Sequence, residues 1–138
     1  VSSILSLGAS VTFLIKNFEK IKKYEENLIK YAYFKLKKLK FLKIYSNEKS
    51  KNIICFNVEN VDSVEVANFL NEIFQICVRA GLHCAPLVHK KLGTLESGAV
   101  RVSLDFNNTT DEVDRLVFAL KRFHELNFGS DFAKNAKH

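Results

Sequence analysis

The residues with the clearest chemical potential lie in one short segment, Arg79 to Pro86. A cysteine acts as a nucleophile through its thiolate, which needs solvent access and positive surroundings. Cys84 follows His83 directly, and Arg79 stands a few residues before it. Gly81 and Pro86 flank the cysteine, and such residues favour turns. The pattern predicts a reactive thiol on a turn. The structural alternative is a small core residue, because free cysteines are usually buried.

Arg101 is the second candidate for chemistry. In residues 98–105, apolar side chains alternate with Arg101 and Ser103, which predicts a strand with one apolar and one polar face. A guanidinium on the polar face can hold a carboxylate through paired hydrogen bonds. The alternative is a solvated arginine that pairs with Asp105 on the same face.

The remaining thiols and imidazoles have simpler interpretations. Cys55 and Cys77 lie in apolar, strand-like runs, so we expect them in the core. His83 is a candidate base or thiolate stabiliser, although neighbouring side chains in an extended segment point apart. His89 stands beside two lysines and is expected in a solvated loop. The three cysteines show no Cys-x-x-Cys spacing, so the sequence predicts neither a disulfide framework nor a metal site.

Length and composition restrict the class of protein. The chain has 138 residues, of which 47% are hydrophobic and 26% charged, as in an ordinary globular domain. It lacks the run of about 18 apolar residues that a membrane span requires. No signal peptide is recognisable, so a reducing cytoplasm is the expected location. The sequence contains no methionine, so we expect it to be part of a longer, processed or divided protein.

The positive charge is concentrated in one region. The net charge is +6, and residues 16–51 contain twelve Lys and four Glu, which leaves the rest of the chain slightly acidic. A basic region of this kind can bind an acidic partner. The alternative, which we favour, is a solvated lysine-rich helix face, because few aromatic or arginine side chains accompany the lysines. Nucleic acid is therefore not an expected partner.

Helices are expected towards both ends of the chain. Residues 1–17 are small and apolar, and residues 18–42 repeat apolar side chains at helical spacing with lysines on the opposite face. Thr109 and Glu112 form a capping box, which predicts the start of a further amphipathic helix. Residues 128–138 are expected to be a tail.

The middle of the chain mixes short strands with a helix. The expected elements are a strand at Ile53–Val58, a helix that begins at Asp62, a short strand at 76–78, a loop at 86–97 and a strand within 98–105. The last two strands have no helical crossover between them, which favours antiparallel pairing. The sequence therefore predicts an α/β (α+β) two-layer domain, in which helices cover a small, mostly antiparallel sheet.

Three segments carry a resemblance to a known family. They read Arg-Ala-Gly-Leu-His-Cys-Ala-Pro-Leu at 79–87, Gly-Ala-Val-Arg-Val-Ser at 98–103 and Asn-Thr-Thr-Asp-Glu-Val-Asp-Arg-Leu at 108–116. Their order and spacing resemble the C-terminal part of class V aminotransferase-type proteins, in the cysteine desulfurase and selenocysteine lyase branch. The resemblance implies the C-terminal small domain of pyridoxal-phosphate (PLP) fold type I at 18–127, after a helix at 1–17 that continues from a missing large domain.

The resemblance also implies roles for individual residues. Cys84 matches the desulfurase nucleophile, which takes sulfur from L-cysteine as a persulfide while alanine is released. Arg101 matches the arginine that holds the substrate carboxylate, Arg79 matches a second substrate-binding arginine, and His83 has a supporting position. The lysine that binds PLP in the family belongs to the missing domain, so we expect no cofactor-binding residue and no cofactor in this chain.

The same resemblance implies partners and leaves alternatives. The parent would be a PLP-dependent enzyme, and the isolated chain is expected to be inactive without the cofactor domain. The implied partners are that N-terminal PLP domain, a second copy in a homodimer and a sulfur-acceptor protein, with no membrane. Leu82 stands where desulfurases often carry histidine, so a parent that acts as a transaminase or lyase on another amino acid is an alternative. A stand-alone basic interaction module is another.

Overall fold

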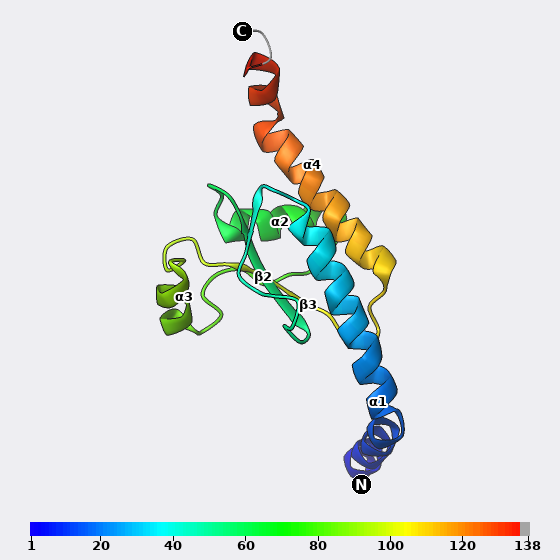
Figure 1. The fold of residues 1–138 in the computed structure, drawn as a ribbon. Coiled ribbons are helices and arrows are strands. Elements are labelled where there is room, and N and C mark those ends of the chain that lie inside the picture. The colour runs from blue at the N-terminus through cyan, green and yellow to red at the C-terminus, as the bar shows by residue number, and fades with distance from the viewer. Residues whose placement is uncertain (136–138) are drawn as a thin grey trace.

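The fold is a small sheet with helices packed on one side. The computed structural model describes residues 1–135, with side chains described through residue 129. The elements are α1 (Ser2–Lys37), β1 (Leu42–Ile44), β2 (Ile53–Val58), α2 (Ser63–Phe74), α3 (Pro86–Leu92), β3 (Val100–Ser103) and α4 (Thr110–Asn135). The strands pair antiparallel in the order β1-β2-β3 (Figure 1). The predicted two-layer α/β class is confirmed.

The pairing register divides the sheet into two different faces. Ile54 and Phe56 on β2 lie opposite Val102 and Val100 on β3, and all of them are buried. Helices α1, α2 and α4 supply the other half of this core. Successive residues along a strand point to opposite faces. The second face therefore carries the intervening residues, which are Lys43, Ile53, Cys55, Asn57, Arg101 and Ser103.

The N-terminal helix is longer and less covered than the sequence pattern predicts. The expected helices at 1–17 and 18–42 form the single continuous helix α1, which ends at Lys37. Its buried residues lie only in the second half, at Leu28, Ile29, Ala32 and Leu36. The first half extends away from the sheet (Figure 1). None of the helices in residues 1–135 combines the length and hydropathy that a membrane crossing needs.

Capping groups fix where the other helices begin. The Asp62 carboxylate accepts a hydrogen bond from the backbone N–H of Val64 at 2.7 Å, so it caps α2 as predicted. At the start of α4, the Thr109 N–H donates to the Glu112 carboxylate at 2.8 Å, and the Glu112 N–H donates back to the Thr109 hydroxyl at 3.3 Å. The predicted capping box is therefore confirmed, and its backbone bond lowers the pKa of Glu112.

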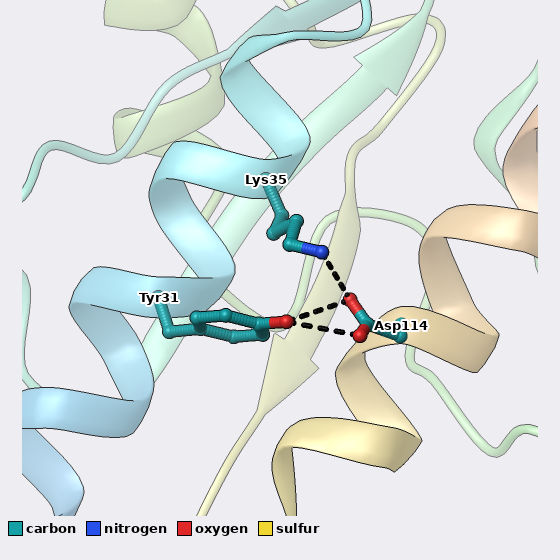
Figure 2. A network of polar contacts seen from close by, with 3 residues as sticks. All are labelled: Tyr31, Lys35 and Asp114. Atoms are coloured by element: carbon teal, nitrogen blue, oxygen red, sulfur yellow. Dashed lines mark hydrogen bonds and ion pairs between the residues drawn. The ribbon is translucent and has the colours of Figure 1, made fainter.

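A polar network joins the two long helices. Lys35 on α1 lies 2.8 Å from the Asp114 carboxylate on α4, and the Tyr31 hydroxyl donates to the same carboxylate at 2.9 Å (Figure 2). The hydrogen bond to Asp114 raises the pKa of Lys35, and the bond from Lys35 lowers the pKa of Asp114. The network lies at the surface, so it fixes the register of the two helices more than it stabilises them.

Several local predictions are wrong. Leu42, expected to be the last residue of the helix at 18–42, is instead the first residue of strand β1. Residues 76–78 form no strand, and only the next residue, Arg79, makes an isolated bridge. The expected loop at 86–97 contains helix α3, which starts at Pro86, a residue suited to a first helical turn. Helix α4 continues to Asn135, within the segment expected to be a tail, and residues 136–138 of that segment lie outside the described residues.

Candidate functional site

Cys84 lies on a tight turn. The Ala85 N–H donates to the Leu82 carbonyl at 2.8 Å, and the two residues between them, His83 and Cys84, have φ of 51° and 58°. Positive φ at both central positions is the pattern of a type I′ turn, which side chains other than glycine or asparagine adopt at a cost. The Cys84 side chain is exposed. The prediction of a thiol displayed on a turn is confirmed, and the buried alternative is wrong.

The two candidate arginines face each other across a backbone bridge. The Arg101 N–H donates to the Arg79 carbonyl at 2.7 Å, and the Arg79 N–H returns a bond to the Arg101 carbonyl at 3.1 Å. Residues directly opposite in an antiparallel pair present their side chains on the same face. Both guanidinium groups therefore belong to the sheet face that the core helices leave open.

Arg101 has unused hydrogen-bonding capacity. Its Nε is buried and has no hydrogen-bond partner. Among the described side chains, the ion pairs are Lys35–Asp114 and Arg122–Glu125, so the alternative pairing of Arg101 with Asp105 is absent. A buried donor without a partner costs free energy. A carboxylate is the ligand whose geometry suits a guanidinium fork, so this pair of arginines is a candidate carboxylate site.

His83 connects the cysteine turn to the strand that carries Arg101. Its Nε2 lies 2.9 Å from the Ala99 carbonyl. A carbonyl oxygen only accepts, so Nε2 must carry the proton, and the neutral ring keeps its lone pair on Nδ1. That Nδ1 is buried without a partner. Burial lowers the pKa of His83, and the positive charges of Arg101 and Arg79 lower it further against the opposing effect of the Ala99 bond.

His89 is a buried residue that packs near His83, and the sequence did not predict this position. It is 3% exposed, its Nδ1 lies 2.8 Å from the Thr94 hydroxyl, and its ring centroid lies 5.7 Å from that of His83. The expectation of a solvated loop residue is wrong, because α3 turns His89 inward. A helical periodicity is hard to recognise in so short a segment, so its burial could not be predicted.

The other cysteines occupy different environments. Cys55 is half-buried and lies directly opposite Arg101 on the open face of the sheet. Burial raises the pKa of the Cys55 thiol, and the charge of Arg101 partly offsets this effect. Cys77 is exposed, so its predicted core position is wrong. Cys84 is thus the exposed thiol on the turn next to the arginines.

An open groove lies beside the candidate site. It has a volume of about 570 Å³ and runs between the β1–β2 edge, the start of α2 and the segment after α3, where its lining includes Lys43, Tyr45, Asp62 and Glu96. None of the four predicted site residues lines it. The cysteine and the arginines therefore lie outside this groove.

The lysines of the described residues lie at the surface of this chain. Every lysine among the described side chains is exposed except Lys35, which pairs with Asp114, so the chain encloses none of them as a Schiff-base lysine is enclosed. No group of three or more His, Cys, Asp or Glu side chains suited to a metal ion occurs in the part of the chain that the structure describes. The chemistry that these residues offer is that of a thiol beside two arginines whose guanidinium groups suit a carboxylate.

Comparisons with known proteins point to one family. Residues 1–116 match the aminotransferase class-V family. A cysteine desulfurase of Klebsiella pneumoniae is 37% identical over 125 residues, which cover 89% of this chain and 30% of that protein. The apo structure of a cysteine desulfurase from Thermococcus onnurineus has a TM-score of 0.76 and 30% identity over 85% of this chain and 29% of its own. A cysteine desulfurase from Escherichia coli has a TM-score of 0.69 and 28% identity over 76% of this chain.

The comparisons also show how much of its relatives this chain represents. The chain spans about 30% of the length of the curated relatives that it matches. The family match covers α1, the whole sheet and the start of α4, and so includes Arg79, Cys84 and Arg101. With this match, and with the fold shared with solved relatives, the chain belongs to the aminotransferase class-V family.

Proposed function

We propose that this chain is the C-terminal domain of a PLP-dependent cysteine desulfurase-like enzyme, and that Cys84 receives the sulfur atom. The observation that carries the proposal is the exposed Cys84 on its turn, next to His83 and to two arginines on one face of the sheet. A thiol that attacks a bound amino acid needs both access and an anchor for the substrate carboxylate. The similarity to named cysteine desulfurases supports the same assignment.

Each residue has a distinct role in the proposed reaction. Arg101, with its unpartnered Nε, holds the substrate α-carboxylate, and Arg79 adds a second positive charge beside it. The Cys84 thiolate forms a bond to the sulfur of L-cysteine, which becomes the outer sulfur of a persulfide. The bond from that sulfur to the substrate carbon breaks, and its electron pair leaves with the carbon, which becomes that of alanine after protonation. His83 has a supporting role, because its ring joins the cysteine turn to the Ala99 carbonyl.

The cofactor belongs to the rest of the whole protein in this proposal. PLP supplies the electron-withdrawing group that makes cleavage of the carbon–sulfur bond possible. The lysines described here are unsuited to hold it, so no step on the cofactor is assigned to this chain. In relatives of about three times this length, the remaining part is where such a site would lie. The proposed partners are the remaining, PLP-binding part of the protein, a second copy in a homodimer and a sulfur-acceptor protein.

The first test is substitution of the nucleophile in the longer protein that carries this chain. Cys84→Ala is expected to abolish the release of sulfide from L-cysteine and the formation of a persulfide, because the accepting thiol is gone. The absorption band of bound PLP is expected to remain. Cys77→Ala is the matched control, since Cys77 is also exposed but lies away from the turn. Sulfide release that survives Cys84→Ala would show that the nucleophile is misassigned.

The same assay separates the alternative activity. Leu82, which stands where desulfurases often carry histidine, is 37% exposed and is the first residue of the turn. If the wild-type protein forms no persulfide but transfers the amino group of another amino acid to a 2-oxo acid, the parent is a transaminase. Loss of that transfer in Arg101→Gln, but not in Cys84→Ala, would then assign carboxylate binding without a nucleophilic cysteine.

A further inference from the structure

We propose that Ser63 is a positioning residue for Cys84, because its hydroxyl group ties the segment that leads into the cysteine turn to the segment that leads into β3. The inference rests on the proposed function, since positioning matters only if Cys84 reacts. We call residues 79–81 and 97–99 the two arms. The arm at 79–81 leads to the turn that carries Cys84, and the arm at 97–99 leads to Arg101 on β3.

Ser63 makes a hydrogen bond to each arm. Its Oγ accepts from the Gly81 N–H at 3.2 Å and donates to the Ser97 carbonyl at 2.6 Å. Its own N–H also donates to the Ser97 carbonyl, at 3.3 Å. Ser63 is 1% exposed, so no water can replace these bonds without rearrangement. A single hydroxyl on α2 thus joins segments that lie far apart in the sequence.

The position of Ser63 follows from how α2 begins. Asp62 caps the helix by accepting from Val64, so the hydroxyl of the next residue is not needed for capping. Ser63 is therefore free to point inward. Serines at helix starts usually cap the helix, and this one serves a tertiary contact. No sequence pattern distinguishes the two uses, which is why sequence analysis did not identify it.

The two arms lie close enough together for the Ser63 hydroxyl to bond to both of them. The Ala99 N–H donates to the Gly81 carbonyl at 3.1 Å, next to the paired bonds of Arg79 and Arg101. A Cβ at Gly98 would lie 2.6 Å from the Gly81 Cα and 2.8 Å from the Ser63 Oγ. Such distances are shorter than van der Waals contact allows. The absence of a side chain at Gly98 is therefore what lets the arms meet.

A further polar side chain fixes one arm independently. Asn57 on β2 donates to the Gly98 carbonyl at 2.9 Å and accepts from the Val100 N–H at 3.3 Å. The arm at 97–99 is thus attached to β2, whereas the arm at 79–81 is held at Arg79 by the paired bonds to Arg101 and at Gly81 by Ala99 and Ser63. Loss of the Ser63 hydroxyl should therefore loosen the arm at 79–81, which leads to Cys84, and leave the arm at 97–99 in place.

The test measures local opening in the 138-residue chain by amide hydrogen exchange. Ser63→Ala is expected to speed exchange of the Gly81 N–H about fivefold, the effect of losing one hydrogen bond. Ser63→Thr keeps a hydroxyl and is expected to restore slow exchange. The NMR titration of the His83 ring is expected to move towards its ordinary pKa in Ser63→Ala, because the ring leaves its buried position.

A pair of glycine substitutions tests the same contact by a steric route. Gly98 and Gly93 both have positive φ, 61° and 72°, but a Cβ at Gly93 meets nothing within 4 Å. In both variants an alanine must adopt a positive φ, which costs a similar free energy, so the variants differ in the steric clash of the new Cβ with Gly81 and Ser63. Gly98→Ala is expected to speed exchange of the Gly81 N–H in the arm at 79–81, and Gly93→Ala is not. Equal exchange in the two variants would overturn the proposed contact.

The outcomes separate a positioning role from a purely structural one. Alkylation of the half-buried Cys55 reports general unfolding, so its rate is expected to stay at the wild-type value in Ser63→Ala. Unchanged Gly81 exchange, or exchange that rises together with Cys55 alkylation, would overturn the proposal. None of these measurements uses a substrate. If Cys84→Ala leaves sulfide release intact while the exchange result holds, the nucleophile assignment fails and the connection between the arms stands.

Discussion

At the scale of single residues, the candidate site combines neighbours in the sequence with supporting residues that lie far from them along the chain. Cys84, His83 and Arg79 lie within one short segment, so their proximity is a local property of the sequence. Arg101 joins them through a backbone bridge that strand alternation alone could not reveal. Ser63 and His89 act through contacts with residues that are distant in the sequence or through burial in a short helix. Such contacts depend on the tertiary fold and leave no periodic signal.

The lowered pKa of His83 predicts a pH dependence of stability. Burial is the main cause, so the folded state disfavours the charged ring. As pH falls below the ordinary value of about 6.5, the unfolded chain takes up this proton more readily than the folded chain. The stabilisation is therefore complete above that pH and is lost as pH falls through the lower folded-state value. We expect wild type to lose more stability than His83→Asn between pH 7.5 and pH 5.5.

Urea unfolding at the two pH values provides the measurement for His83. Asparagine accepts positive φ readily, so the variant should keep the turn, although its shorter side chain gives up the bond to the Ala99 carbonyl. His124→Asn is the matched control for a histidine outside the site. An equal pH response in wild type and His83→Asn would contradict the prediction, because titration of other groups would then account for it.

At the scale of elements, the helix starts were more predictable than the strands and the helix ends. Asp62 and the pair Thr109–Glu112 mark helix starts through local hydrogen bonds that the sequence states directly. β1 has only three residues and includes Lys43, so no alternation could identify it. It forms because β2 offers a partner edge, with Leu42 opposite Val58 and Ile44 opposite Phe56. Whether so short a segment forms a strand therefore depends on a partner strand that is distant in the sequence.

The capping box at the start of α4 yields a stability prediction. Thr109→Ala removes the hydroxyl that accepts the Glu112 N–H, so it is expected to cost about 1 kcal/mol of unfolding free energy. Thr109→Ser retains the acceptor and is the control, with a smaller expected loss. Chemical denaturation followed by circular dichroism gives both values. A Thr109→Ala variant as stable as wild type would show that water satisfies this amide equally well.

At the scale of the whole molecule, the chain has a helix whose halves have opposite character. The first half of α1 exposes apolar side chains, with Ile4 at 75% and Leu5 at 69%, while its second half forms part of the core. Exposed apolar surface of this extent marks an interaction site. The proposed PLP domain is the partner we expect on it.

Removal of residues 1–11 tests how separate the two halves are. These residues make no contribution to the core cluster, so the deletion is expected to change the unfolding free energy by less than about 0.5 kcal/mol. Binding of a hydrophobic dye and self-association in gel filtration should both decrease. Phe13, which packs near Phe106, is retained in the shortened chain. A large loss of stability would indicate that the first half of α1 does support the fold.

The opposed arginines have a consequence for the melting temperature. Arg79 and Arg101 place like charges directly opposite each other, an arrangement that destabilises a sheet. A dicarboxylate such as malonate would relieve this repulsion and, by binding only the folded chain, raise its melting point. Arg79→Gln is expected to melt higher than wild type without ligand and to gain less when malonate is added. Thermal denaturation of this chain alone could therefore report occupancy of the carboxylate site, without substrate turnover.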